Sequence, residues 1–128
     1  MNGLLDTHNF IWTNSNSDRL SPQLRDFIED ESNHLYLSIA SVWEMQIKIQ
    51  SGKLSLKYTL LETIRHQREA NGIEILPISL PHIYEIRELL LHHRDPFDCV
   101  LIAQARIENL ILLSVDDVFS QYSVPLLR

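Results

Sequence analysis

The sequence predicts a three-layer α/β/α fold, in which helices cover both faces of a central parallel sheet of about four to five strands. Short apolar runs with strand character alternate along the chain with amphipathic helical stretches. These runs are continuously apolar, which is typical of strands buried on both faces. The 128 residues, 45% of them hydrophobic, suffice for one compact domain and are too few for two ordinary ones. We therefore expect a single domain over residues 1–128.

In the first half of the chain, apolar spacing and the residues that punctuate it define five elements. Ser21 followed by Pro22 suits a helix start, because Ser caps free N–H groups and Pro fills the first helical position. Gly52 suits a helix end. The expected elements are a strand at residues 4–5 that ends on Asp6, a helical turn at 7–13, a helix at 22–28, a strand at 35–38 and a largely buried helix from 39 to Gly52.

The second half of the chain repeats this alternation. Asn71 and Gly72 close one helix, and Asp95 followed by Pro96 opens another. Pro125 lacks the N–H group that a central strand donates, so a strand around it belongs at a sheet edge. The expected elements are a helix at 60–70, a strand at 73–78, helices at 83–90 and 96–109, a strand at 110–113 and an edge strand within 122–127.

Composition and charge exclude several broad classes of protein. The net charge of −6, from 11 Lys and Arg against 17 Asp and Glu, disfavours a basic protein that coats nucleic acid, although an enzyme with a local basic rim remains compatible. Cys99 is the lone cysteine, which rules out an internal disulfide, and beside Asp98 it is expected to be a core thiol. No secretory signal is recognisable, and no apolar run approaches the roughly 20 residues of a membrane helix. We expect a soluble, cytoplasmic protein.

Four carboxylates fall where open parallel sheets bind ligands, just outside the carboxyl ends of the strands. Asp6 directly follows the first strand and Asp116 follows the late one. Glu44 and Asp98 lie near the starts of helices that begin in the same layer. Carboxylates gathered in one cleft repel one another and require a divalent cation, and an oxygen-only set suits Mg²⁺, with Mn²⁺ as a possible substitute. The pattern predicts a metal-binding acidic site.

Each of these acids also has a structural interpretation. Asp95 suits an N-cap, which places Asp98 in a first turn, where the helix dipole favours negative charge. Asp6 and Asp116 can cap the helices that follow them. For Asp95 we favour the cap, whereas for the others the spacing leaves both interpretations open.

Glu44 has two such alternatives. With Ser41 it matches a capping box, whereas a cap at Ser38 would place Glu44 inside the helix. Lys48 lies four residues after Glu44, a spacing that is typical of a surface ion pair worth a few tenths of a kcal/mol.

Other residue types give weaker signals. We expect Trp12, Trp43 and Phe97 to be core or interface aromatics instead of platforms for stacked bases. Residues 92–93, both His, lack a third ligand at zinc spacing and suit a solvated loop. The sequence has neither a glycine-rich phosphate loop nor a nucleophile elbow.

Several short blocks of residues, spread over nearly the whole chain, match the sequence pattern of a known family in the same order. They are Leu4-Leu5-Asp6-Thr7-His8, Ser41-Val42-Trp43-Glu44 with Ile47-Lys48, Gly52-Lys53-Leu54, His93-Arg94-Asp95-Pro96-Phe97-Asp98 through Leu101-Ile102-Ala103-Gln104-Ala105, Leu113-Ser114-Val115-Asp116 and Phe119-Ser120-Gln121-Tyr122. In these blocks the sequence resembles the PIN-domain ribonucleases. Within them it looks like the VapC toxins of bacterial type II toxin-antitoxin pairs.

The resemblance implies a role for each of the four acids. The positions that match the family's catalytic acids are Asp6, Glu44, Asp98 and Asp116. Asp6, Asp98 and Asp116 are implied as metal ligands, directly or through water. Glu44 is implied either to ligate the metal or to orient the attacking water. Thr7 matches a hydroxyl beside the first acid and is implied to orient that carboxylate or a metal-bound water.

The implied activity is Mg²⁺-dependent hydrolysis of RNA phosphodiester bonds by an activated water, without a covalent enzyme intermediate. The implied partners are an RNA substrate, a second copy of the chain in a homodimer, and a cognate antitoxin. A segment of the antitoxin would lie across an apolar groove and obstruct the site, and Trp12 and Phe27 are candidates for that groove.

Contacts to RNA phosphates require basic residues near the acids. The candidates are Lys48, Arg94 and Arg106. Cys99 stands where many relatives have Arg, which argues against a phosphate-binding cation at that position.

Two other classes of function compete with this one. A catalytically inactive PIN-like binding module would use the same fold for protein or RNA contact, although the presence of all four acids argues against it. A phosphotransfer enzyme or receiver would use Asp6 as a nucleophile. The phosphatase pattern expects an Asp where His8 stands, and the receiver pattern expects a Lys where Asp116 stands.

Overall fold

The computed structural model describes residues 1–89 and 95–128. Its elements are, in chain order, β1 (Asn2–Leu5), α1 (Thr7–Ser15), α2 (Pro22–Glu29), β2 (His34–Ser38), α3 (Ile39–Gln50), α4 (Leu60–Asn71), β3 (Glu74–Leu76), α5 (Leu80–Leu89), α6 (Pro96–Glu108), β4 (Ile111–Leu113), the 3₁₀ helix η1 (Asp117–Gln121) and β5 (Leu126–Leu127). Leu90, the two His of 92–93 and Arg94 lie outside the described residues.

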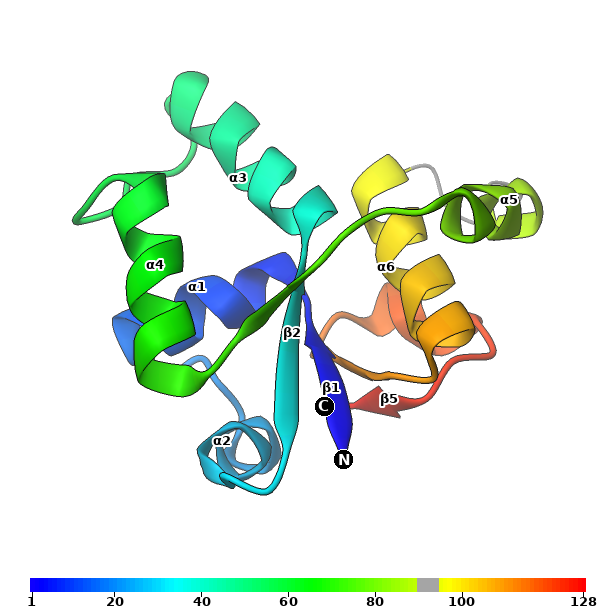
Figure 1. The fold of residues 1–128 in the computed structure, drawn as a ribbon, viewed down its shortest axis with the longest axis horizontal. Coiled ribbons are helices and arrows are strands. Elements are labelled where there is room, and N and C mark those ends of the chain that lie inside the picture. The colour runs from blue at the N-terminus through cyan, green and yellow to red at the C-terminus, as the bar shows by residue number, and fades with distance from the viewer. Residues whose placement is uncertain (90–94) are drawn as a thin grey trace.

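The strands form a parallel sheet, as the apolar runs predict. In the described part of the chain it has five strands in the order β3-β2-β1-β4-β5 (Figure 1). From β1 the chain adds strands on one side as far as β3 and then returns to place β4 on the other side of β1. The strand order therefore reverses at β1 and β4, and such a switch point opens a ligand crevice at the carboxyl ends of the strands.

Helices cover both faces of this sheet, so the predicted three-layer arrangement is confirmed (Figure 1). Leu4 and Leu5 are both fully buried on opposite faces, because successive strand residues point to opposite sides. Leu4 joins an apolar cluster with residues of α6 and η1, whereas Leu5 joins one with residues of α1, α2 and α3. A sheet buried in this way holds its strand ends rigidly, and the candidate site lies at those ends.

Local capping signals fix the helix boundaries that the sequence predicts. The Ser21 and Asp95 side chains each accept a hydrogen bond from a backbone N–H in the first turn of the following helix. At α3 the cap is Ser38, which accepts from the Ala40 N–H at 3.0 Å. The capping box of Ser41 with Glu44 is therefore wrong, and Glu44 lies in the second turn of α3.

The largely buried helix predicted from residue 39 to Gly52 is only half buried. Ile39, Trp43 and Ile47 are 42%, 59% and 43% exposed and form one apolar stripe along α3. Their spacing of four residues places them on the same helix face. Trp43 is therefore not a core aromatic.

None of the described helices is long and apolar enough to span a membrane.

Phe27 is a core residue in the structure and not part of a groove, because it is only 6% exposed. Its ring packs directly against Gly3 in β1. A Cβ added at Gly3 would lie 2.7 Å from Phe27 Cε1 and 2.9 Å from Leu113 Cδ1. This close approach explains a glycine within a central strand.

Candidate active site

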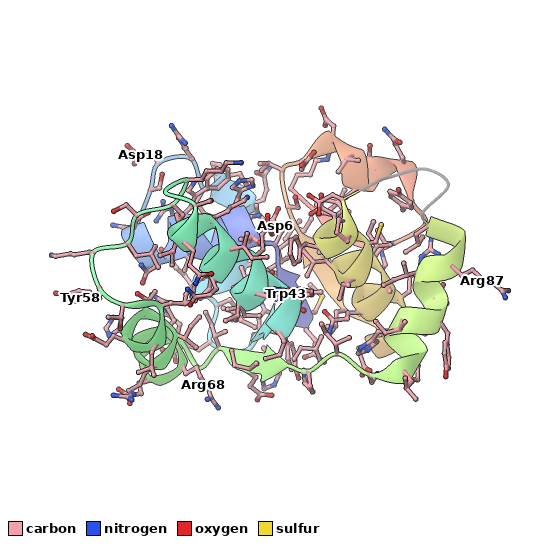
Figure 2. All side chains as sticks on the ribbon, turned by 90° about the horizontal axis from the view of Figure 1, so that it is seen from above. Asp6, Asp18, Trp43, Tyr58, Arg68 and Arg87 are labelled. Atoms are coloured by element: carbon pink, nitrogen blue, oxygen red, sulfur yellow. The ribbon has the colours of Figure 1, made fainter. Side chains whose placement is uncertain are left out.

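The fold brings Asp6 and Asp116 together at the carboxyl ends of β1 and β4. Leu5 pairs with Leu113 in the β1–β4 ladder, so Asp6 and Ser114, the residues that follow them, lie next to each other. Figure 2 looks down onto this edge of the sheet and shows Asp6 between α3 and α6. Asp6 and Asp116 thus border the region outside these strand ends where such sheets bind ligands, hereafter the crevice, as the strand assignment predicts.

Asp6 is a buried carboxylate, with 5% of its surface exposed. It caps α1, because its Oδ1 accepts a hydrogen bond from the Asn9 backbone N–H at 2.7 Å. Burial raises the pKa of Asp6 above its ordinary value, and the negative charge of Asp116 adds to that rise. Hydrogen bonds from Ser114 and Asn9 and the nearby charge of His8 lower the pKa but do not cancel the effect of burial. A cation beside Asp6 would offset this penalty.

Ser114 connects the two strand-end acids. Its hydroxyl donates to the Asp6 carboxylate, and its Oγ accepts the Asp116 backbone N–H at 3.0 Å. Asp116 itself is exposed and caps η1 by accepting the Val118 N–H at 3.1 Å. Both acids are therefore helix caps, as the structural interpretation of the sequence expects, and their metal-binding and catalytic roles stay predictions.

Glu44 lies on the α3 side of the crevice and is held by two partners. Its Oε1 accepts a hydrogen bond from the Thr7 hydroxyl at 2.7 Å, and its Oε2 lies 2.8 Å from Lys48 Nζ. The Ser41 hydroxyl lies 3.0 Å from the Thr7 hydroxyl. The expected pair of Glu44 and Lys48 is thus present. Thr7 was expected to orient the Asp6 carboxylate or a metal-bound water, and its hydroxyl donates to Glu44 and not to Asp6. A contact between Thr7 and a metal-bound water stays a prediction.

Replacing Thr7 with Val tests this contact, since Val keeps the shape and removes the hydroxyl. We expect the free energy of unfolding in urea to fall by about 1–3 kcal/mol, the cost of leaving a buried polar group without its partner. Thr7→Ser keeps the donor and should lose much less. An equal loss in both variants would mean that the methyl group of Thr7, and not its hydroxyl, supplies the stability.

Asp98 lies half-buried in the first turn of α6, where Asp95 is the N-cap as expected. Asp95 Oδ1 accepts the Phe97 and Asp98 backbone N–H groups at 2.9 and 3.3 Å. The Phe97 ring meets the Trp43 ring edge-on, with 5.2 Å between centroids, and so joins the start of α6 to α3. Asp98 and Glu44 therefore come from the two helices that flank the crevice.

Cys99, next to Asp98, is fully buried, as the sequence suggests. Burial raises the pKa of this thiol, with further contributions from the Asp98 and Asp95 charges. A raised pKa keeps the sulfur protonated and unreactive, so Cys99 is a core residue.

The donor set at the crevice fits Mg²⁺ in chemistry and leaves most of its coordination to other ligands. Among the described residues, no three acidic, histidine or cysteine side chains lie close enough together to hold a metal ion. Mg²⁺ usually retains several waters and takes only one or two carboxylates, with substrate phosphates filling further positions. Asp6 and Asp116, two neighbouring carboxylates of which one is buried, satisfy that smaller requirement. Magnesium binding stays a prediction.

The three basic residues proposed as phosphate contacts do not lie together in the structure. Lys48 forms an ion pair with Glu44 on α3. Arg106 lies in the last turn of α6, where its guanidinium bonds the Ser123 carbonyl at 2.9 Å and pairs with Glu85 at 3.3 Å. Eight residues of helix, about 12 Å, separate Arg106 from Asp98, so Arg106 is not a phosphate contact at this site. Arg94 lies outside the described residues.

Sequence reasoning missed two polar residues that support the site. Ser114 bridges Asp6 and Asp116, and only the β1–β4 register reveals it as the neighbour of Asp6. The Asn9 side-chain amide donates to the Leu113 carbonyl at 2.8 Å and ties α1 to the end of β4. The Asn9 side chain is fully buried, which the structure shows and no local sequence pattern indicates.

These features define a class of protein: a parallel α/β/α domain with buried and partly buried acids at the switch point of its sheet. The PIN domain family profile matches residues 3–125, which is nearly the whole chain. The chain belongs to the PIN domain family.

Solved structures of low sequence identity share the fold. VapBC2 from Rickettsia felis bound to a promoter DNA fragment matches with 16% identity and a TM-score of 0.74, over 99% of this chain and 98% of the other. A toxin-antitoxin complex from Klebsiella pneumoniae has 16% identity and a TM-score of 0.67, over 98% and 96%. FitAcB from Neisseria gonorrhoeae has 18% identity and a TM-score of 0.67, over 98% and 96%. No curated protein matches the chain significantly.

Proposed function

We propose that this chain is a metal-dependent endoribonuclease and the toxin of a type II toxin-antitoxin pair, acting in the cytoplasm. The observation that carries the proposal is the buried carboxylate of Asp6 beside Asp116 at the switch point of a PIN domain. Acids with a raised pKa in a crevice are typical of sites that bind metal or perform acid-base chemistry. Glu44 and Asp98, on the flanking helices, complete the set of four acids.

Asp6, Asp98 and Asp116 would hold Mg²⁺, directly or through water. When bound, the ion polarises a phosphate and lowers the pKa of a water that can attack it. The chain's own groups prepare the site: Ser114 and Asn9 fix the Asp6 carboxylate, and the Thr7 hydroxyl fixes one oxygen of Glu44. Glu44 then orients the attacking water, and the phosphodiester is hydrolysed without a covalent enzyme intermediate.

An antitoxin is the second part of the proposal. The similar chains from Rickettsia felis and Klebsiella pneumoniae belong to VapBC2 and to a toxin-antitoxin complex. Between α3 and α4 this chain has an apolar groove of about 760 Å³ that a helical segment would fit. Its apolar lining is Val42, Leu60, Leu61, Ile64 and Ile73, with Arg65 and Arg68 alongside. Of the two residues expected to line such a groove, Phe27 is buried and does not, whereas Trp12 is half-buried and stacked on His8 and stays a candidate.

A homodimer is the third part. The stripe of Ile39, Trp43 and Ile47 on α3 is a set of large apolar side chains in water, which marks an interaction surface in a protein of this size. A second copy of the chain would cover it.

An inactive binding module is the competing function. It is favoured by one observation, since no three side chains of the described residues form a metal-binding cluster. RNA cleavage separates the two. Purified wild-type protein is incubated with mixed transfer and ribosomal RNA, once in Mg²⁺ and once with EDTA. The Asp98→Asn variant is assayed in Mg²⁺. Asp26→Asn, at an exposed position of α2, is the matched control. We expect cleavage by the wild type and the control, and none with EDTA or Asp98→Asn. Cleavage that survives EDTA or Asp98→Asn contradicts this site, and a wild type that cleaves neither RNA and gives no Mg²⁺ binding by calorimetry favours the binding module.

A further inference from the structure

We propose that Lys48 is a phosphate-binding residue of this site, held over the crevice by Glu44. The inference rests on the proposed function and adds to it the group that meets the negative charge of the RNA. Its basis is the 2.8 Å contact between Lys48 Nζ and Glu44 Oε2, together with the place of Glu44 beside the first turn of α1.

The pair differs from an ordinary ion pair on a helix surface. In an ordinary pair both side chains are solvated, and the contact is worth little. The Glu44 side chain is only 11% exposed and the Lys48 side chain 35% exposed. The ammonium therefore reaches inward from the surface of α3 to a carboxylate that is itself anchored by Thr7. This arrangement fixes the position of a positive charge.

The position matters because the four acids of the proposed site are sources of negative charge. Asp6 and Asp116 lie near each other at the strand ends, Glu44 and Asp98 come from the flanking helices, and an RNA phosphate that approaches these carboxylates needs cations to bind. A metal ion supplies one such charge. Lys48 supplies another that belongs to the chain itself and is present before any metal binds.

Three arginines of the described residues have partners away from the four acids. Arg25 bonds Asn16 and the Ser17 carbonyl, Arg106 pairs with Glu85, and Arg128 pairs with Asp117. Within residues 1–89 and 95–128, Lys48 is the cation that forms a salt bridge with one of the four acids.

The chemistry of the ammonium suits this task. It has three N–H donors, and one of them satisfies Glu44. The other two N–H groups are free to donate hydrogen bonds to a phosphate oxygen, because the ammonium sits on a flexible side chain, and lysine binds phosphate in this way at many sites. Glu44 is then a positioning residue for Lys48, in addition to the role proposed for it above.

Lys48→Met tests the proposal, because Met keeps the length of the stem and removes the charge. Binding of a fluorescein-labelled oligouridine is measured by anisotropy over a range of salt concentrations, in the Asp98→Asn background so that the RNA stays intact. The matched control is Lys53→Met, at an exposed lysine just beyond the end of α3. Lys48→Arg keeps the charge, and circular dichroism verifies that each variant is folded.

We expect Lys48→Met to weaken oligouridine binding about tenfold, the effect of losing one charged hydrogen bond. The slope of log affinity against log salt should fall in magnitude by about 0.7, the value for one phosphate contact on a single strand. Lys48→Arg should restore most of the affinity. With Asp98 present, Lys48→Met should raise the KM for RNA cleavage and leave kcat nearly unchanged.

The proposal is overturned if folded Lys48→Met binds oligouridine with the same affinity and salt slope as Lys53→Met, since Lys48 is then only an ion-pair partner. It is equally overturned if the parent protein does not bind RNA. Failure of the proposed nuclease function has a different signature, because RNA cleavage is then absent while the binding difference between Lys48→Met and Lys53→Met persists.

Discussion

Replacing Asp6 with Asn is expected to stabilise the metal-free protein at neutral pH and to abolish its RNA cleavage. Asp6 is buried, and burial raises its pKa above the ordinary value, because ionising this carboxyl group in the folded protein costs free energy. Asn keeps the side-chain oxygen that caps α1 and is neutral. We expect the free energy of unfolding to rise by on the order of 1 kcal/mol, as for other substitutions that remove an unfavourable surface or site charge.

The gain should depend on pH in a defined direction. The pKa of Asp6 in the unfolded chain is near the ordinary value of 3.8, and in the folded protein it is higher. Between these two values the folded state binds more protons than the unfolded state, so the wild type loses stability as the pH rises through that window. The difference between Asp6→Asn and the wild type should therefore be small below pH 3.8 and reach its full size above the folded pKa. Urea denaturation in EDTA over a pH series measures it.

Activity should change in the opposite direction. Losing a metal-binding carboxylate should reduce cleavage by at least about 100-fold, because the ion provides several kcal/mol of transition-state stabilisation. Added Mg²⁺ should raise the thermal stability of the wild type but not of Asp6→Asn, since only the wild type binds the ion in its folded state. Asp18→Asn, at an exposed position away from Asp6 in Figure 2, should leave the wild-type pattern unchanged. A less stable Asp6→Asn protein at neutral pH would contradict the assignment.

Local sequence signals predict the elements of this fold well because their causes are local. Ser21 and Asp95 cap helices within three residues of themselves, and Asn109 ends α6 in the left-handed conformation that suits a helix C-terminus. The short β3 and β5 are less well predicted. Residues 73–78 have strand character throughout, but only Glu74–Leu76 find partners along β2.

Contacts within the site were harder to predict because they join residues far apart in the chain. The Thr7 hydroxyl bonds Glu44, 37 residues away, and the Asn9 side chain bonds the Leu113 carbonyl, 104 residues away. The exposed stripe on α3 was mispredicted for a related reason. Ile39, Trp43 and Ile47 have the composition of core residues, and apolar character alone cannot tell a core from a surface that a partner covers.

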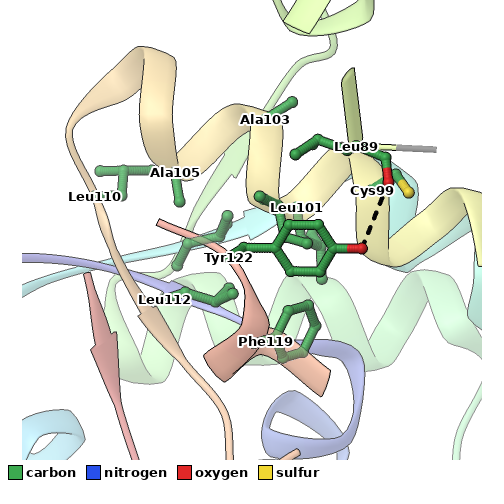
Figure 3. Packing of buried hydrophobic residues seen from close by; sticks show 11 residues of the cluster. Leu89, Cys99, Leu101, Ala103, Ala105, Leu110, Leu112, Phe119 and Tyr122 are labelled. Atoms are coloured by element: carbon green, nitrogen blue, oxygen red, sulfur yellow. Dashed lines mark hydrogen bonds between the residues drawn. The ribbon is translucent and has the colours of Figure 1, made fainter. Parts of the chain in front are cut away.

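Replacing Phe119 with Ala is expected to be the most destabilising of the substitutions considered. Phe119 is 1% exposed, and its ring packs within the cluster of α6, β4 and η1 (Figure 3). Truncating a buried Phe costs about 3–5 kcal/mol through lost apolar burial and the cavity that remains. A domain of this size has about 5–15 kcal/mol of stability in total, so much of it would be lost. Urea denaturation measures the loss, and Gln121→Ala, exposed on the same η1, should stay within about 0.5 kcal/mol of the wild type.

The same substitution connects the core to the site. Phe119 is anchored three residues after Asp116, and its backbone N–H donates to the Asp116 carbonyl at 3.3 Å. When the ring is removed, η1 loses the contact that holds it against β4, and Asp116 loses its fixed place beside Asp6. We therefore expect folded Phe119→Ala, at low temperature, to gain less stability from Mg²⁺ than the wild type does. An unchanged gain from Mg²⁺ would show that Asp116 is positioned by Ser114 alone and that the packing of η1 serves only the core.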